Sequence, residues 1–216
     1  LQHKFTTPAR LILLEGGEGI DLQQYPYGDT TPAPTTFLMV ARVLKDKGYN
    51  EFVQAAKIVK QTMPEVSFQL LGQMDTSNPA HVTPEELHRD IDAGYIEYLG
   101  TTNDVQSVVR RAGVVVVLPS YHEGMSRSLM EACAMGRPII TTDIPGCRET
   151  VDEGRSGFIV PVKNSQALAE AMLRYIRLDD ATKQSFCAAA RERAKRIFDV
   201  NIVIKAYKNI LQTAGV

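Results

Sequence analysis

Short apolar or β-branched runs alternate along this chain with segments in which apolar residues recur at helical spacing. Near-continuous apolar strands that alternate with helices predict a parallel sheet covered on both faces. The expected fold is α/β, a doubly wound Rossmann-like layer in which ligands bind at the carboxyl ends of the strands. The six expected strands are 36–41, 66–72, 96–100, 113–119, 137–143 and 157–162. The helical patterns between them cover 50–62, 84–93, 103–111, 127–135 and 165–178.

Composition excludes several classes of protein. The formal net charge of −1 over 216 residues gives no global attraction to nucleic acid or to an anionic membrane, so any anion site must be local. Three cysteines, an odd number without metal-ligand spacing, indicate reduced thiols in a cytosolic protein. There is no apolar run of 18 residues and no signal-peptide pattern. We therefore expect a cytoplasmic protein.

The two ends depart from the alternating pattern. Residues 22–36 hold three of the eleven prolines and few aliphatic residues, which is typical of a linker that enters a domain. Residues 180–214 are predicted to be helical throughout, and the charge run RERAKR at 191–196 is interpreted as a solvated helix face. The start at Leu1, without Met, indicates a fragment.

The segment HEGMSRSLMEACAMGRP at 122–138 follows the strand 113–119 and begins a helix near Ser126. A helix start presents free backbone N–H groups and the positive end of the helix dipole. Gly124 permits close approach to the backbone. A loop of this kind at the carboxyl end of a parallel strand predicts an anion site suited to phosphate.

Two carboxylates flank this expected anion site. Glu123 and Glu131 are eight residues apart, roughly 12 Å along a helix, which suits a ligand with phosphate in its middle and hydroxyl groups at both ends. A nucleoside-diphosphate sugar has this layout, with Glu131 accepting from ribose and Glu123 from the hexose. Arg42 and Lys47 follow the first strand, at the same edge of the sheet, and could neutralise a diphosphate.

In these residues and their order, the chain resembles the nucleotide-sugar-binding half of retaining glycosyltransferases of the GT-B fold, in the large family-4 group. The stretches that carry the resemblance are VARVLKDKG, LPSYHEGMSRSLMEACAMGRPIITTDIPG and ETVDEGRSGFIVPVKNSQALAEAM. Upstream, LILLEGGEGIDLQQY resembles the strand and GxGxD turn that close the acceptor half of such enzymes. Ala41 departs from the pattern, since the family usually has Gly there.

The resemblance implies a role for each matching residue. Glu123 would contact the donor hexose, Glu131 would hold the ribose hydroxyls, and Arg42 and Lys47 would bind the diphosphate. Seven further residues would border the bound donor. They are Gly124, Met125 and Ser126 through backbone N–H groups near the hexose, Ser128 and Leu129 near the phosphates and ribose, and Thr101 and Thr102 near the base. Gly146 would belong to a loop near the cleft.

The resemblance further implies that the full enzyme moves a hexose from a nucleotide diphosphate sugar, with UDP the expected nucleotide, to a glycan or lipid-linked acceptor in cell-envelope polysaccharide synthesis. We interpret 1–35 as a remnant of an N-terminal domain and a linker, 36–180 as the donor-binding domain, and 181–216 as helices that pack back or toward the missing half. The fragment alone is expected to be inactive, and the full protein to allow peripheral membrane association. Exposed Ile202, Ile204 and Tyr207 would allow the fragment to dimerise.

Other interpretations remain open at this stage. A nucleotide-sugar epimerase of the same architecture would need an acid–base pair, for which the sequence offers no candidate. A non-catalytic nucleotide-sugar-binding module is the other alternative. No metal or other cofactor is expected, because Arg42, Lys47 and the helix N-terminus would supply the positive charge that a diphosphate requires. DID at 90–92 lies at a predicted helix end instead of after a buried strand, so it is not interpreted as a metal site. His122 is interpreted as a solvent-facing loop residue and Cys133 as a packing residue.

Overall fold

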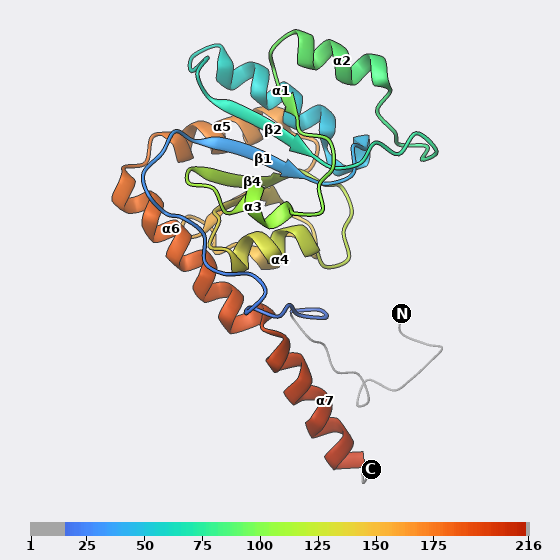
Figure 1. Cartoon of the computed structure of the whole chain (residues 1–216), viewed down its shortest axis with the longest axis vertical. Coiled ribbons are helices and arrows are strands. Elements are labelled where there is room, and N and C mark those ends of the chain that lie inside the picture. The colour runs from blue at the N-terminus through green and yellow to red at the C-terminus, as the bar shows by residue number, and fades with distance from the viewer. Residues whose placement is uncertain (1–15, 215–216) are drawn as a thin grey trace.

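The computed structural model describes residues 16–214 and has a six-stranded parallel sheet at its centre, in the order β3-β2-β1-β4-β5-β6 (Figure 1). The strands are β1 (Thr36–Val40), β2 (Ser67–Leu71), β3 (Glu97–Tyr98), β4 (Val114–Leu118), β5 (Ile139–Thr142) and β6 (Gly157–Val160). The predicted doubly wound α/β fold is therefore confirmed. Each expected run contains one strand, although the strands are shorter by one or more residues at their ends.

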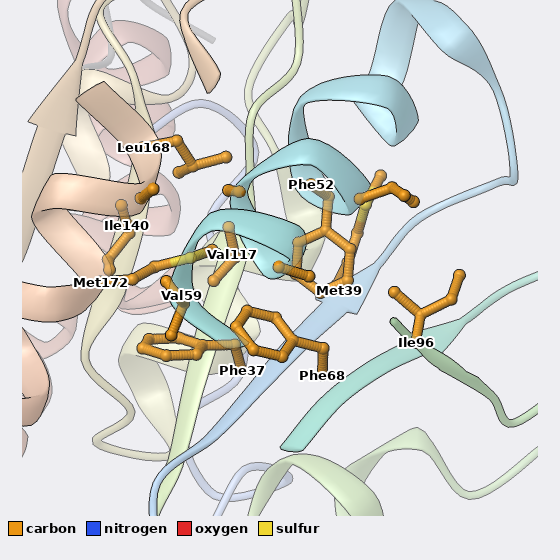
Figure 2. Packing of buried hydrophobic residues seen from close by; sticks show 14 of the residues in the cluster. Phe37, Met39, Phe52, Val59, Phe68, Ile96, Val117, Ile140, Leu168 and Met172 are labelled. Atoms are coloured by element: carbon orange, nitrogen blue, oxygen red, sulfur yellow. The ribbon is translucent and has the colours of Figure 1, made fainter. Parts of the chain in front are cut away.

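The sheet is buried on both faces because helices cover both of them. α1 (Tyr49–Lys60) and α5 (Ser165–Ile176) pack on one face, around a cluster that includes Phe37, Phe52 and Phe68 (Figure 2). The other face carries α4 (Arg127–Ala134) and α6 (Asp180–Arg193), whose apolar residues join those of β4 in a second cluster. All five residues of β4 are buried, as expected for a central strand of a parallel sheet.

Helix starts differ in how their backbone N–H groups are satisfied. α2 (Pro84–Asp92), α3 (Val105–Val109), α5 and α6 each begin with a side chain that accepts a hydrogen bond from a first-turn amide. These capping residues are Thr83, Asp104, Asn164 and Asp179. α1 and α4 begin at Gly48 and Ser126 without such a side-chain bond. Their first-turn amides are therefore left for other acceptors.

The prediction that 180–214 is helical throughout is wrong at one point. α6 continues into a π-helical turn (Ala194–Phe198), and Asp199 then adopts an extended conformation before α7 (Val200–Ala214) begins. A bridge to the upstream segment causes the break, since Ile20 N donates to Phe198 O and Val200 N donates to Ile20 O. α7 then extends away from the sheet (Figure 1). Its Ile202, Ile204 and Tyr207 are exposed, as expected.

The interpretation of RERAKR at 191–196 as a solvated face is wrong for two of its arginines. Arg191 Nη1 donates to Tyr25 O at 2.9 Å and also to Ala134 O, which ties the upstream segment to α4 and α6. Arg193 Nε donates to Glu149 O at 2.7 Å, and its guanidinium pairs with Asp152. Lys195 and Arg196 are exposed, as predicted.

The segment that precedes β1 is ordered against the second cluster, with Ile20 and Tyr25 buried. Gly28 N donates to Met135 O at 2.9 Å, which holds the same segment on the end of α4. The expected turn appears at residues 16–18, whereas the strand expected before it lies outside the described residues. None of the helices in residues 16–214 is long and apolar enough to span a bilayer.

The three cysteines are free and buried. Burial raises the pKa of the Cys133 and Cys147 thiols to about 12, and it also raises the pKa of Cys187. Because the thiolate is the reactive form, we expect the native protein to react very slowly with a disulfide reagent such as DTNB at pH 8. After addition of denaturant, all three thiols should become exposed and react with DTNB rapidly. Fast reaction of one equivalent in the folded state would contradict the burial described here.

Candidate donor site

The candidate site lies where the order of the strands reverses. β1 pairs with β2 on one side and with β4 on the other, so the chain leaves β1 and β4 in opposite directions across the sheet. A crevice forms at such a switch point, outside the carboxyl ends of the two strands, and ligands of open α/β sheets bind there. The loop after β1 carries Arg42 and Lys47, and the loop after β4 carries Glu123 and Gly124.

The two loops contact each other directly through the backbone. Tyr121 N donates to Asp46 O at 2.9 Å. Gly48 has φ +84°, and a Cβ there would lie 2.2 Å from Pro119 O, so a larger residue would separate the loops. Gly48 is also the residue at which α1 begins. The start of α1 therefore lies against the loop that leads from β4 to α4.

The start of α4 offers unpaired backbone donors. Within the described residues, the amides of Gly124, Met125, Arg127, Ser128 and Leu129 donate no recorded hydrogen bond. Ser126 differs from the expectation, because its amide donates to Gly146 O at 2.9 Å. It can serve a ligand only indirectly, by fixing the loop. The free amides and the helix dipole together favour an anion.

Gly146 lies against this loop, as expected. A Cβ on Gly146, whose φ is +85°, would lie 1.6 Å from Gly124 O. Gly146 N donates to Glu149 Oε2 at 2.8 Å, so the loop after β5 is fixed on both sides of the contact. The close approach of the two backbones requires glycine at this position.

Lys47 and Glu123 form an ion pair between the loop after β1 and the loop after β4, with Nζ and Oε1 2.7 Å apart. Their side chains are 20% and 15% exposed, so water screens the pair only partly. Glu123 is thus not free in this structure, and Lys47 is held against the loop that leads into α4. A diphosphate bound at these amides would compete with Glu123 for Lys47.

Arg42 leaves β1 beside a pocket of about 230 Å³. The pocket is lined by Val40, Ala41, Arg42, Leu71, Gly72, Gln73, Thr101, Thr102 and Val105. Thr101 and Thr102 therefore lie on the same pocket as Arg42. The Arg42 side chain is half exposed and pairs with Asp75 at 3.0 Å, so it would have to turn from Asp75 to meet a phosphate.

Glu131 lies on α4 and accepts two hydrogen bonds on the same oxygen, Oε1. Tyr25 Oη donates at 2.8 Å and Arg127 Nε at 2.9 Å. Tyr25 comes from the segment that precedes β1, 106 residues away in sequence. No donor from residues 16–214 is recorded on Oε2, and the side chain is 17% exposed. One oxygen of Glu131 is therefore fixed and the other is open to a ligand.

The remaining predicted residues fall into two groups. Ser128 is half-buried beside Ser126, with 3.4 Å between the two hydroxyl oxygens. The side chain of Leu129 is fully buried in the second cluster, so only its backbone groups can contact a ligand. The side chain of Met125 packs against the same cluster and is half-buried. His122 is exposed, as predicted.

The DID stretch at 90–92 forms the last residues of α2. Asp90 is 2% exposed, accepts from Tyr49 Oη at 2.9 Å and lies on α2, away from the switch point. Among the described residues, no group of three or more His, Cys, Asp or Glu side chains is arranged to hold a metal ion.

Sequence reasoning missed two residues at the site, Asp75 and Tyr25. Asp75 pairs with Arg42, and Tyr25 with Glu131, across 33 and 106 residues. Tyr25 lies in a stretch interpreted as a linker, where two aromatic residues, Tyr25 and Tyr27, among polar and proline residues could have signalled an anchored segment.

Comparison with known proteins identifies the family. Residues 34–177 match the family model of the glycosyl transferases group 1. The chain therefore belongs to this family, whose GT-B fold and glycosyltransferase activity the resemblance predicted. It is 31% identical over 170 residues to the N,N′-diacetylbacillosaminyl-diphospho-undecaprenol α-1,3-N-acetylgalactosaminyltransferase of Campylobacter jejuni, covering 79% of this chain and 42% of the relative. It is 27% identical to the capsular polysaccharide biosynthesis glycosyltransferase CapM of Staphylococcus aureus, covering 81% and 45%.

Solved structures show the same fold. Anabaena HepE in complex with UDP superposes with a TM-score of 0.77 at 22% identity, over 90% of this chain and 56% of that one. The chain spans about half the length of the curated relatives that it matches, 42% and 45% of the two named above.

Proposed function

We propose that this chain is the donor-binding half of a retaining glycosyltransferase that transfers a hexose from a nucleotide diphosphate sugar, with UDP as the nucleotide. Residues 36–180 form the donor-binding domain in this proposal, 1–35 belong to the preceding half and the connection to it, and 181–216 pack back on the domain or reach toward the other half. The acceptor would be a glycan or a lipid-linked saccharide. The names of the relatives in Campylobacter jejuni and Staphylococcus aureus support this class of acceptor.

One observation carries the proposal: the only two helix starts among α1–α6 without a side-chain cap meet at the switch point, beside Lys47. An uncapped start leaves amides that must find another acceptor, and a phosphate group supplies several oxygen atoms for them. Lys47 and Arg42 add positive charge at the same edge. A diphosphate with four or more oxygen atoms fits this arrangement better than a single carboxylate does.

The two glutamates would bind the two sugar groups of the donor, on either side of its diphosphate. Glu131, with Oε2 open, lies four positions beyond Arg127 on α4 and would accept from the ribose hydroxyls. Glu123 precedes the anion loop and would accept from the hexose once Lys47 turns to the diphosphate. The base would occupy the pocket that Thr101 and Thr102 line.

The chemistry follows from this placement. The bond between the anomeric carbon and the β-phosphate oxygen breaks while the acceptor hydroxyl forms a bond to the same carbon. Attack from the face that the phosphate leaves retains the configuration, and a phosphate oxygen takes the hydroxyl proton. Lys47, Arg42 and the α4 amides stabilise the departing charge and hold the reacting atoms close. Since these groups already supply positive charge, the proposed reaction needs no bound metal, and activity should persist in the presence of EDTA.

Calorimetric titration of UDP, GDP and ADP into this chain tests nucleotide binding. We expect saturable binding of UDP with the other two weaker. The full-length protein should then release UDP from a UDP-hexose only when acceptor is present. Release without acceptor, or interconversion of two UDP-hexoses, would instead indicate hydrolysis or epimerisation, and binding without any turnover would indicate a sensing module.

The Glu131→Ala substitution should weaken uridine as well as UDP by about tenfold or more, because a charge-assisted hydrogen bond contributes about 1.5–3 kcal/mol. The loss of affinity should appear with uridine, which has no phosphate, because the partner of Glu131 is the ribose. Glu170→Ala, which replaces an exposed glutamate on α5, is the matched control and should leave both affinities unchanged. Unaltered uridine and UDP affinities in Glu131→Ala would refute the ribose assignment. Calorimetry measures both ligands.

A further inference from the structure

Tyr25 is fixed to the donor domain more firmly than a linker residue would be. Its side chain is 8% exposed and packs in the second cluster with residues of α4 and α6. Arg191 holds its backbone, because Nη1 donates to Tyr25 O at 2.9 Å and Nη2 donates to Leu22 O at 3.5 Å. The phenol is therefore presented to Glu131 from a rigid support. In Figure 1 this blue segment passes beneath α4.

The two donors on Glu131 differ in rigidity. Arg127 is 62% exposed and divides its guanidinium between Glu131 and Glu18, which is itself 70% exposed. Exposed pairs of this kind contribute little, since water screens them and long side chains must be ordered. Tyr25 is buried and has two side-chain torsions, so it holds its oxygen in one place. Of the two donors, Tyr25 is the one that determines where Oε1 lies.

Fixing one oxygen fixes the whole carboxylate. An ionised carboxylate only accepts hydrogen bonds, at about four lone-pair positions shared between its two oxygens. Tyr25 and Arg127 both bond Oε1, so rotation of the group would break both contacts. The orientation of Oε2 is then set before any ligand arrives. A pair of adjacent hydroxyls requires such an orientation, because each must meet an acceptor lone pair.

Toward Glu131, Tyr25 acts as the donor at neutral pH. Burial raises the pKa of the Tyr25 phenol above its usual value of 10.0, and the hydrogen bond to Glu131 raises it further, against a lowering by Arg127. The phenol therefore keeps its proton and donates it to Glu131 Oε1. This polarity suits a carboxylate that must accept from sugar hydroxyls with its other oxygen.

We propose that Tyr25 is a positioning residue of the ribose subsite, which orients Glu131 Oε2 toward the 2′- and 3′-hydroxyls and so determines the preference for ribonucleotides over deoxyribonucleotides. The inference rests on the proposed function, since it takes Glu131 as the ribose ligand. It goes beyond that function by making the segment before β1 part of the nucleotide site. A residue outside the Rossmann-like layer then sets the sugar specificity of the nucleotide.

Calorimetric titration of UDP and 2′-deoxy-UDP against the unaltered chain, Tyr25→Phe and Tyr27→Phe tests this proposal. The unaltered chain should prefer UDP by about tenfold, as expected for one hydrogen bond to a charged group. Tyr25→Phe keeps the ring and removes the hydroxyl, and the preference should fall to about threefold or less, with 2′-deoxy-UDP affinity changed less than about twofold. Tyr27→Phe removes a half-exposed phenol from the same segment and should keep the full preference.

Each outcome separates this inference from the proposed function. No UDP binding by the unaltered chain would overturn the proposed function and this inference with it. UDP binding with an unchanged preference in Tyr25→Phe would overturn the inference alone, as would an equal loss for both nucleotides, which indicates a purely structural role. Arg127→Ala is a second variant that removes the exposed donor. It should reduce the preference less than Tyr25→Phe does, and the opposite order would contradict the assignment.

Discussion

Replacement of Lys47 by alanine is expected to weaken UDP binding by about tenfold to a hundredfold. A hydrogen bond between charged groups contributes about 1.5–3 kcal/mol, and this substitution removes one from the diphosphate. It also leaves Glu123, whose side chain is only 15% exposed, without its partner 2.7 Å away. The unaltered chain has to break this ion pair when Lys47 turns to the diphosphate, and the variant does not, which offsets a smaller part of the loss. The two consequences therefore act in opposite directions, and calorimetry with UDP measures their sum.

A double-mutant cycle separates the two consequences. Glu123→Gln alone should tighten UDP by about twofold to fivefold, because Lys47 no longer has to leave a partly exposed ion pair. Lys47→Ala should cost more in the Glu123→Gln background than in the unaltered chain, since Lys47 there gives up no ion pair to reach the diphosphate. Equal costs in both backgrounds would show that the Lys47–Glu123 pair does not compete with the diphosphate. Lys57→Ala, on α1, serves as the control for loss of one lysine.

The second large effect is expected from Gly146→Ala, which should weaken UDP by about tenfold or more and lower the melting temperature. The left-handed conformation costs a residue with a Cβ about 1–2 kcal/mol, and forced contacts in a packed region cost about 1–3 kcal/mol. At Gly146, with φ +85°, the new Cβ would lie 1.6 Å from Gly124 O. The loop before α4 would have to move, and the bond from Ser126 N to Gly146 O would be lost.

Gly94→Ala is the matched control for backbone strain. Gly94 has φ +72°, and a Cβ there would meet no atom within 4 Å. This variant should lose some stability through strain alone and bind UDP as the unaltered chain does. The difference between the two variants isolates the effect of displacing the anion loop. Equal UDP affinities in Gly146→Ala and Gly94→Ala would contradict the role assigned to the loop contact.

The sheet was predictable because its signal is local. A strand such as β4 is buried on all sides, so every residue of VVVVL is apolar, and the run can be recognised without any knowledge of its neighbours. The start of α4 was predictable for a similar reason, since Ser126 precedes a helical pattern. The break at Asp199 was not predictable, because apolar residues continue at helical spacing and the cause is a pairing with Ile20.

The sequence predicted which residues lie at the candidate site, but it did not predict which side chains these residues pair with. The carboxyl ends of neighbouring parallel strands meet at one edge of the sheet, so strand order alone brings Lys47 and Glu123 together. The pairs Arg42–Asp75 and Tyr25–Glu131 depend on the paths of loops and of the segment before β1. No periodicity encodes such paths. The same applies to Ser126, whose amide is taken by Gly146 O.

A crystal structure of this chain with UDP would test the central claim most directly. The account predicts density for the diphosphate at the free amides that begin α4, with Lys47 Nζ turned from Glu123 to a phosphate oxygen and the ribose against Glu131 Oε2. A diphosphate bound at another edge of the sheet, or an intact Lys47–Glu123 pair with no phosphate beside it, would contradict the account.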